Sequence, residues 1–277
     1  MPARLTFDPL PQDVAETLAV SRTRVGAFGN VRYRAEVDST NDLAIDLAAA
    51  GAPEGTAVLA GAQRAGRGRR GRSWFSPPGA GLYLSVVVRP VGPADALPLV
   101  TLASGVAAAR ALHTATGLGV ELKWPNDLVT GRPWRKLGGL LCEAVGGGAT
   151  VDAIVVGIGV NLRPAAYPPE IADRATSIED ELGRPVDRAL VVCEMLASLA
   201  DVTARLWRRE RRWICDEWRR LGRAGLGGAA IRWTEQGVAR RGVARDIDDE
   251  GGLMVDAEGR AHRLVGGEVF WERLSRE

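Results

Sequence analysis

Residues 64–76 of the chain read RAGRGRRGRSWFS, and the sequence on either side of them indicates two strands of an α/β core. Arginine carries a permanent charge on a planar group that matches phosphate and carboxylate oxygens. Glycine lets the backbone turn so that several N–H groups face one anion. The stretch therefore predicts a loop that surrounds a negatively charged ligand.

Two other interpretations of residues 64–72 remain open at this point. The run of charges can be a solvated turn, or it can contact nucleic acid while Trp74 and Phe75 stack on bases. The second is disfavoured because the loop joins two strands of a core domain rather than lying in a disordered tail. Loops of this composition make few apolar contacts and often become ordered only when a ligand binds.

The spacing of apolar residues predicts the elements around the loop. Alternation or short apolar runs predict strands at residues 31–37, 56–62, 82–89, 120–123, 138–145 and 153–160. Helical spacing predicts helices at residues 43–50, after the capping residues 38–41, and at residues 97–116. One or two surface helices are expected over residues 188–221, and an irregular or partly helical lead-in over residues 1–30.

The glycine-rich segment GRAGLGG at residues 222–228 is the best domain boundary in the chain. Beyond it, short strands alternate with turn signals such as DEGG at residues 249–252 and Glu258-Gly259. We therefore expect a larger α/β domain over residues 1–224, with its core starting at about residue 30, and a small β-barrel over residues 225–277.

Bulk composition excludes several classes of protein. The 277 residues are 46% apolar and carry a formal net charge of only +2, so a sizeable core is expected and a chain-wide basic surface for nucleic acid is not. Three widely spaced cysteines and two distant histidines disfavour a disulfide framework or a metal site rich in histidine. No signal-peptide pattern and no long apolar run is present. A cytoplasmic protein without a membrane or nucleic-acid partner is expected.

The segment KWPND at residues 123–127 places a lysine, an amide and a carboxylate on a bent stretch of chain. Asp127 can hold Mg²⁺ that bridges phosphates, and Asn126 can orient a ligand. The alternative is an Asx-turn, in which both side chains bond their own backbone.

Two further segments place polar groups beside glycines. Lys136 precedes Gly138-Gly139, so its ammonium can point into a cleft as a charge for a carboxylate or phosphate, or it can simply extend to solvent at the strand end. The segment GIGVN at residues 157–161 permits close backbone approach. Neither a P-loop nor a Rossmann fingerprint is present, so a nucleotide site here would be of another kind.

These segments, in this order, resemble the biotin protein ligases, also called biotin–[acetyl-CoA-carboxylase] ligases. The resemblance is dense over residues 31–165 and is carried by DSTN at 38–41, Gln63, GRGRRGR at 66–72, WFSP at 74–77, LYLS at 82–85, KWPND at 123–127, KLGG at 136–139 and GIGVN at 157–161. It implies a mixed-sheet α/β (α+β) catalytic domain of the class II synthetase-like, biotin–lipoate ligase type, followed by a small SH3-like β-barrel.

The resemblance also implies an activity. ATP and biotin would give biotinyl-5′-AMP and pyrophosphate with the help of Mg²⁺, and a lysine of a biotin carboxyl carrier domain of acetyl-CoA or acyl-CoA carboxylases would then take the biotin. No covalent enzyme intermediate is implied. Two alternatives are kept: a lipoate or octanoate protein ligase on the same fold, and a nucleic-acid-binding module that uses the arginine stretch.

By similarity, individual residues receive roles. Biotin would be bound by Ser39, Thr40, Asn41, Gln63, Gly66, Arg67, Arg69, Lys136 and Gly138. ATP and the adenylate would be bound by Arg67, Arg69, Arg72, Trp74, Lys123, Asn126 and Asn161. Lys136, Arg69, Asp127 and Asn126 would act in catalysis, and Asp127 would bind Mg²⁺.

One departure from the family pattern concerns the N-terminal side. Bifunctional members carry an N-terminal winged-helix DNA-binding domain of about sixty residues. Only about thirty residues precede the first predicted core strand here. A ligase that is not a DNA-binding repressor is therefore expected.

Overall fold

A seven-stranded mixed sheet forms the larger part of the computed structural model, which describes residues 6–89, 97–131, 133–146, 151–223, 225–235, 237–267 and 269–272. The spatial order is β1-β2-β3-β7-β6-β5-β4, with β1 parallel to β2 and every other pair antiparallel. The strands are β1 (Val31–Val37), β2 (Ala57–Gln63), β3 (Gly81–Val88), β4 (Glu121–Lys123), β5 (Asp127–Thr130), β6 (Arg135–Val145) and β7 (Ala153–Asn161). The predicted mixed-sheet α/β class is confirmed.

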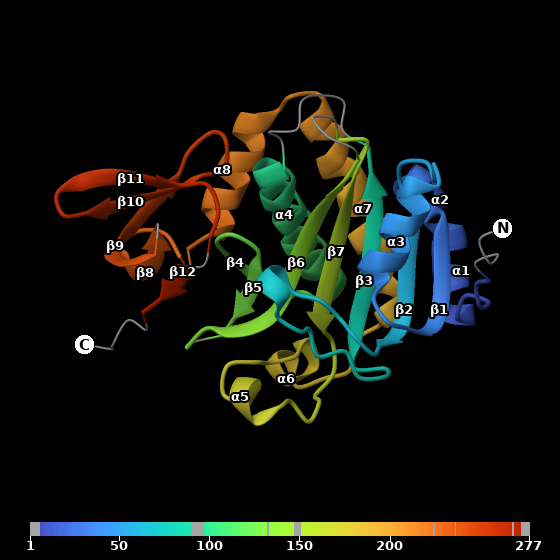
Figure 1. Cartoon of the computed structure of the whole chain (residues 1–277). Helices are drawn as coiled ribbons and strands as arrows, with labels where there is room; N and C mark the ends of the chain where they lie inside the picture. Colours follow the sequence, from blue (N-terminus) through green and yellow to red (C-terminus); the bar gives the residue numbers. More distant parts are fainter. Residues whose placement is uncertain are drawn as a thin grey trace.

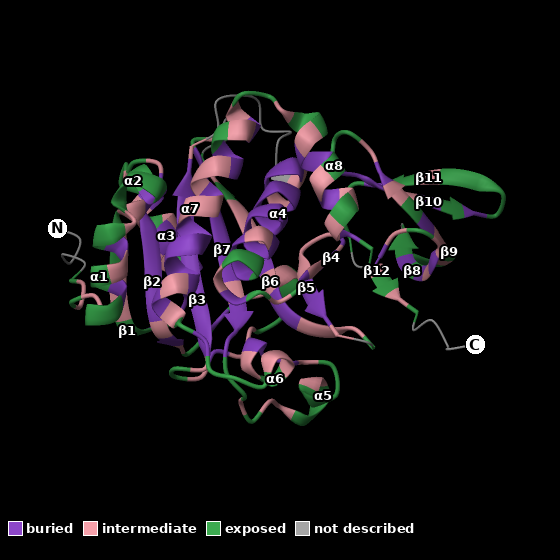
Figure 2. Cartoon of the chain, turned by 180° about the vertical axis from the view of Figure 1, so that it is seen from behind, coloured by how far each residue is buried: buried purple, intermediate pink, exposed green. Residues whose placement is uncertain are grey.

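Helices cover both faces of this sheet (Figures 1 and 2). One face carries α3 (Thr40–Ala49), and the other carries α4 (Leu97–Thr116) and α7 (Arg188–Trp207). The short elements α1 (Gln12–Val20), α2 (Arg22–Val25) and η1 (Gly26–Gly29) pack with α7 near β1, and α8 (Arg211–Leu221) packs against α4. The remaining short helices are η2 (Arg69–Gly71), α5 (Pro169–Ala172) and α6 (Ile178–Leu182).

Strand β3 shows why the sheet needs both layers. All eight of its residues are buried, because its neighbours β2 and β7 lie on either side and helices cover both faces. Alternate residues serve different layers: Leu84 and Val86 join the large core under α4 and α7, whereas Val87 packs with the small cluster under α3. Figure 2 shows this buried centre in purple.

The start of α3 is fixed by Ser39, whose hydroxyl accepts a hydrogen bond from the backbone N–H of Asp42. The helix therefore begins at Thr40, three residues earlier than the sequence predicted, and places polar residues in its first turn. This first turn faces the site described below.

The C-terminal part forms a separate five-stranded antiparallel sheet with the order β11-β10-β9-β8-β12. Its strands are β8 (Ala229–Glu235), β9 (Val238–Ile247), β10 (Leu253–Ala257), β11 (Arg260–Leu264) and β12 (Val269–Trp271). It lies at the β4 end of the large sheet, opposite α1 (Figure 1). The Trp124 indole N–H donates to the Gly251 carbonyl at 3.0 Å, and Arg219 of α8 bonds Asp246 at 2.9 Å. The small β domain is thereby tied to the edge of the sheet that carries the site.

The structure reproduces most of the expected elements and adds several short ones. The helix over residues 97–116 is confirmed at both ends, and the two helices over residues 188–221 are present. Strands β5 and β11 and helices α5 and α6 had no counterpart in the sequence analysis. In the described part of the chain, no helix combines the length and the apolar character needed to cross a membrane.

Candidate active site

A cluster of buried amides and hydroxyls lies where the first turn of α3 meets the sheet. Thr40 donates from its backbone N–H and its hydroxyl to Gln63 Oε1, at 2.9 and 3.1 Å. Ser85, fully buried on β3, places its hydroxyl 2.8 Å from Thr40 Oγ1 and 2.6 Å from Asn41 Oδ1. Four of the residues expected to bind biotin, Ser39, Thr40, Asn41 and Gln63, are thus brought together, and Ser85 joins them.

Three glycines leave the sheet bare beside this cluster. A side chain at Gly157 would overlap the Asn41 amide, and one at Gly159 would overlap the Trp74 indole. A side chain at Gly139, which pairs with Gly159 across the two strands, would lie in contact with the Lys136 side chain, 3.5 Å from its ammonium. These glycines form a floor on the α3 face of β6 and β7, over which a flat ligand has access to the backbone.

Gly138 does not belong to this floor. A side chain there would point at Leu128 and Val160, which belong to the core under α4. Its predicted contact with biotin could therefore involve only its backbone. Gly139, one residue later, takes the position on the site face.

The KWPND segment turns at a cis Trp124–Pro125 bond and leads into β5. The side-chain amide of Asn126 donates to the Leu140 carbonyl at 2.8 Å. The backbone carbonyl of Asn126 accepts from the Leu140 N–H at 2.9 Å. Asp127 Oδ1 accepts a hydrogen bond from Lys136 Nζ at 2.6 Å. The two side chains are thus engaged with β6 rather than with their own turn, which contradicts the Asx-turn alternative.

Three cations surround Asp127. Besides Lys136, the Lys123 ammonium and the Arg69 guanidinium interact electrostatically with this carboxylate. Burial lowers the pKa of Lys123 below its ordinary value, and the Asp127 charge opposes that shift. Burial also lowers the pKa of Arg69, which makes one long hydrogen bond of 3.4 Å to Asn126 Oδ1. Because one carboxylate does not balance three cations, this end of the floor attracts anions.

Lys123 and Lys136 are the only two lysines in the sequence, and the other 34 of its 36 basic residues are arginines. Both ammonium groups interact with Asp127 within the site. Lys136 Nζ is 5.6 Å from the centre of the Trp74 ring, and Lys123 Nζ is 6.0 Å from that of Trp271 in β12. The C-terminal sheet therefore reaches the edge of the cation cluster.

Trp74 lies against Gly159 of the glycine floor, with the Lys136 ammonium 5.6 Å from its ring centre, on the side expected to receive the adenylate. Its indole N–H is buried and has no hydrogen-bond partner among the described residues. A buried donor without an acceptor is costly and points to an acceptor that a ligand supplies.

The arginine stretch folds as a short hairpin over the site. Trp74 N–H donates to Gly66 O and Gly68 N–H to Arg72 O, each at 2.7 Å, and the tip is η2, with Arg70 in the left-handed region at φ 58°. Gly66 is required here because a side chain would collide with the Trp74 carbonyl at 2.6 Å. The predicted loop is therefore a hairpin with its own backbone hydrogen bonds.

Within the hairpin, Arg67 pairs with the carboxylates of Glu143 and Asp42 rather than with that of Asp127. It donates two hydrogen bonds to Glu143, at 2.9 and 2.7 Å, and lies 2.6 Å from Asp42. Arg64 likewise pairs with Glu36 and Asp38. These pairings reduce the positive potential that a nucleic-acid strand would need. Glu143 was not identified from the sequence, since a single glutamate near a strand end looks like a solvated residue.

Asn161 serves the fold at the far end of β7. Its amide donates to the Thr176 carbonyl at 2.9 Å, and the residue is buried. This bond ties β7 to the segment that leads into α6. The predicted contact with adenine would use the amide oxygen or the second amide hydrogen of Asn161.

In the part of the chain that the structure describes, side chains alone do not enclose a metal ion. Among the described residues, no group of three histidine, cysteine, aspartate or glutamate side chains converges. Asp127 and Asn126 offer one carboxylate and one amide. That set suits Mg²⁺, which usually takes one or two carboxylates and completes its coordination with phosphate oxygens and water.

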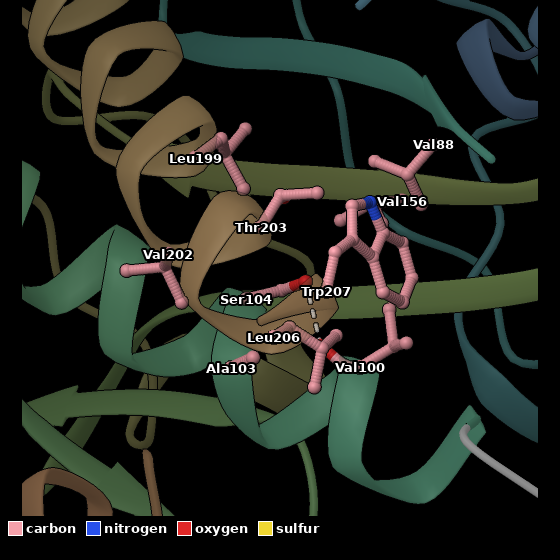
Figure 3. Close-up of a pocket in the computed structure, with 10 residues that line it drawn as sticks. All are labelled: Val88, Val100, Ala103, Ser104, Val156, Leu199, Val202, Thr203, Leu206 and Trp207. Atoms are coloured by element: carbon pink, nitrogen blue, oxygen red, sulfur yellow. Dashed lines mark hydrogen bonds between the residues drawn. The ribbon is translucent and has the colours of Figure 1, made fainter. Parts of the chain in front are cut away.

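A separate cavity lies between the sheet and helices α4 and α7 (Figure 3). Its volume is about 10 Å³, and most of the side chains around it, such as Val156, Leu199 and Leu206, are apolar. This volume suffices for about one water molecule. The cavity is therefore a packing feature of the core, and the site on the opposite face is the candidate for ligand binding.

Comparison with known proteins gives a consistent result. The model of the biotin/lipoate A/B protein ligase family matches residues 33–161. The bifunctional ligase/repressor BirA of Bacillus subtilis is 38% identical over 167 residues, which cover 59% of this chain and 50% of that protein, so the match spans half of that relative. The biotin–[acetyl-CoA-carboxylase] ligase of Paracoccus denitrificans is 36% identical over 249 residues, which cover 86% of this chain and 98% of that protein.

The fold comparison agrees with the sequence comparison. The structure of biotin protein ligase from Aquifex aeolicus in complex with biotin and ATP matches with a TM-score of 0.75 and 28% identity, over 88% of this chain and 99% of that one. The similarity to the Paracoccus protein extends over nearly its whole length at more than a third identity. The chain therefore belongs to the biotin/lipoate A/B protein ligase family, and the relatives it resembles within that family are biotin protein ligases.

Proposed function

We propose that this protein joins biotin to AMP at the expense of ATP and then transfers the biotinyl group to a lysine of a biotin carboxyl carrier domain. The observation that carries the proposal is the cation cluster of Lys123, Lys136 and Arg69 around Asp127, at one end of a glycine floor. At the other end lie the buried hydroxyls and amides of α3 and β3. This arrangement suits a ligand with a polar uncharged head and an anionic tail.

The polar end fits the cyclic urea of biotin. A urea carries one carbonyl acceptor and two N–H donors, and Ser39, Thr40, Asn41 and Gln63 provide both kinds of partner. The dithiolane ring of lipoate has no N–H donor and no carbonyl acceptor. It would therefore offer these groups no hydrogen-bond partner. The cluster therefore favours biotin over lipoate or octanoate.

The cationic end serves the first reaction step. A biotin carboxylate oxygen attacks the α-phosphorus of ATP, the bond to the β-phosphate oxygen breaks, and pyrophosphate leaves. Both reactants are anions, so their approach must be stabilised by fixed positive charge. Lys136, held at 2.6 Å by Asp127, and Arg69 supply that charge between the floor and the hairpin.

Trp74 covers the nucleotide side of the same site. Its buried indole N–H has no partner among the described residues, so an acceptor on the adenylate would satisfy it, and its ring lies over Gly159. Lys123 and the C-terminal β domain, through Trp271, border this side. We assign ATP and adenylate binding to these groups, together with Arg72 and Asn126.

In the second step, the amine of the acceptor lysine attacks the acyl carbon of biotinyl-AMP, loses a proton and releases AMP. No enzyme nucleophile is required. Burial raises the pKa of Cys142 to about 11, so this thiol stays protonated near neutral pH. Mg²⁺ bound by Asp127 together with the nucleotide phosphates would neutralise phosphate charge.

The test is incubation of the protein with ATP, Mg²⁺, labelled biotin and a carrier domain. We expect label on the acceptor lysine, and excess lipoate is expected not to compete. Absence of label with an intact carrier would refute the proposal, and effective competition by lipoate would support the lipoate alternative. Tight, strongly salt-dependent binding of random single-stranded oligonucleotides would instead favour the nucleic-acid module.

A further inference from the structure

Glu143 occupies a junction between the sheet, helix α3 and the arginine hairpin. Its Oε2 accepts from Asn41 Nδ2 at 2.8 Å and from Arg67 at 2.7 Å, while Oε1 accepts from Arg67 at 2.9 Å. Two residues expected to bind biotin are thus held by one carboxylate that sequence analysis did not identify. About a quarter of its side chain is exposed, so the bidentate pair is shielded from water in part.

Arg67 is paired with carboxylates, whereas the Arg69 side chain is hydrogen-bonded to an uncharged amide. Arg67 faces two carboxylates, Glu143 and Asp42, which leaves little of its positive charge for another anion. Arg69, at the tip of the same hairpin, is more buried and makes a long bond to the uncharged Asn126 amide. The anion-binding role therefore suits Arg69, whereas Arg67 serves as an attachment.

The attachment point lies in the middle of one arm of the hairpin. Arg67 pairs with Ser73 across the hairpin, between the Gly66–Trp74 and Gly68–Arg72 hydrogen bonds. Holding this arm against β6 fixes the height of the tip, and hence of Arg69, above the glycine floor. It also fixes the backbone of Gly66 beside Gln63.

We propose that Glu143 is a positioning residue, which holds the arginine hairpin over the biotin site through Arg67 and orients Asn41 with its other lone pair. This rests on the function proposed above and assigns Arg67 a part that differs from direct contact with phosphate. The guanidinium of Arg67 stays on Glu143 and Asp42 while biotin and ATP are bound.

The test compares Glu143→Gln with Glu36→Gln in the full-length protein. Glu36 pairs with Arg64 of the same stretch at 3.0 Å but is about half exposed and lies on β1, outside α3 and the floor, so its variant is the matched control. We expect Glu143→Gln to raise the KM for biotin about tenfold in biotin-dependent ATP–pyrophosphate exchange. The KM for ATP and kcat should stay within about twofold, and the melting temperature should match that of the control.

The opposite model makes the opposite prediction. If Arg67 leaves Glu143 to bind the anions, Glu143→Gln frees the guanidinium and lowers the KM for biotin or ATP. Either that result, or kinetics equal to those of Glu36→Gln, overturns the proposal. A parallel rise in both KM values with a fall in kcat and melting temperature also overturns it, because that pattern indicates general disruption.

Two further measurements separate this proposal from the proposed function. The effect of the double variant Arg67→Met/Glu143→Gln should be smaller than the sum of the two single effects, since both changes remove the Arg67–Glu143 pair. Tryptic cleavage after Arg69, Arg70 or Arg72 should be faster in Glu143→Gln than in Glu36→Gln even without substrates. A wild-type protein that shows no biotin-dependent exchange refutes the function, whereas equal cleavage rates refute the tether alone.

Discussion

Lys136 Nζ lies 2.6 Å from Asp127 Oδ1, across the β5–β6 hairpin that brings residues nine positions apart to adjacent strands. The same carboxylate interacts with Lys123 and Arg69. Asp127 thus offers one negative charge to three cations. The remaining positive charge is available to the carboxylate and phosphate groups that the proposed reaction brings together.

Replacing Asp127 should change the pH dependence of the reaction. Burial lowers the pKa of Lys123, and Asp127 is the group that opposes this shift, so Asp127→Asn lowers that pKa further. Activity that needs the Lys123 ammonium is lost as pH rises through this pKa. The alkaline limb of adenylate formation should therefore move to lower pH in Asp127→Asn, whatever its maximal rate.

A second variant tests whether the alkaline limb of the pH–rate profile belongs to Lys123. Arginine keeps its charge over the whole accessible range. In Asp127→Asn/Lys123→Arg the alkaline limb should return to higher pH when ATP–pyrophosphate exchange is followed from pH 6 to 10. A limb that stays in place in Asp127→Asn would contradict the assignment to Lys123.

Adding one methyl group to the glycine floor should disturb the site more than the fold. In Gly159→Ala the new methyl overlaps the Trp74 indole, which must shift away from the sheet. Overpacking of this kind costs about 1–3 kcal/mol of unfolding free energy. Adenylate formation should fall by more than tenfold, with the larger effect on the KM for ATP.

The matched control for this change is Gly119→Ala, where the added methyl meets no atom within 4 Å and φ is not positive. Thermal unfolding and exchange kinetics of the two variants would be measured side by side. Equal behaviour of Gly159→Ala and Gly119→Ala would show that Trp74 does not depend on the bare floor.

Much of the fold followed from local patterns. Helix α4 was predicted at both ends because small and apolar residues recur at helical spacing over its twenty residues. Strand β5 was missed because four residues, DLVT, show no alternation, and their extended state is set by pairing with β4 and β6. Strand β11, with the sequence RAHRL, carries too few apolar residues to stand out.

The site was predictable in its parts but not in its connections. The sequence drew attention to Lys136, Asp127 and the arginine stretch because charges stand next to glycines there. It could not show that Arg67 and Glu143 meet, because 76 positions separate them and the contact depends on the sheet order. Nor could it show that Gly139 rather than Gly138 faces the site, which depends on the phase of β6.

Thiol reagents should leave the activity unchanged. Burial raises the pKa of Cys142, Cys193 and Cys215 to about 11 each. At pH 8 only about one thiol in a thousand is then ionised, roughly a hundredfold less than for a free cysteine. Treatment with iodoacetamide at pH 8 for one hour should neither label the native protein appreciably nor slow exchange. Rapid stoichiometric labelling with loss of activity would contradict the absence of a cysteine nucleophile.

The protein should resist biotinylating itself. Apart from its N-terminal amine, the chain holds two amines, and Asp127 engages both of them, Lys136 through a hydrogen bond and Lys123 by its charge, which holds them away from the acyl carbon. Arginine at other positions is too weakly nucleophilic to attack an acyl adenylate because it stays protonated. Mass spectrometry after incubation with ATP, Mg²⁺ and biotin, without a carrier, should find no biotinylated lysine.

Lysines introduced by substitution at the surface show which positions the adenylate can biotinylate. Arg174 is largely exposed, and its backbone carbonyl accepts from Lys136 N–H at 2.6 Å, so Arg174→Lys places an amine at the edge of the site. Arg212 on α8 is almost fully exposed and lies on the helix that packs on α4. Biotin should appear on residue 174 of the first variant and not on residue 212 of Arg212→Lys. Equal labelling of both would mean that the adenylate is released before it reacts.

The most direct test of the central claim is biotin-dependent ATP–pyrophosphate exchange by the wild type, Lys136→Met and Arg163→Met. Arg163 is an exposed cation paired with Glu179 and serves as the control. If fixed charge at Asp127 brings biotin and ATP together, the wild type and Arg163→Met exchange at similar rates, and Lys136→Met loses at least about a hundredfold. Undiminished exchange in Lys136→Met, or none in the wild type, would contradict this account.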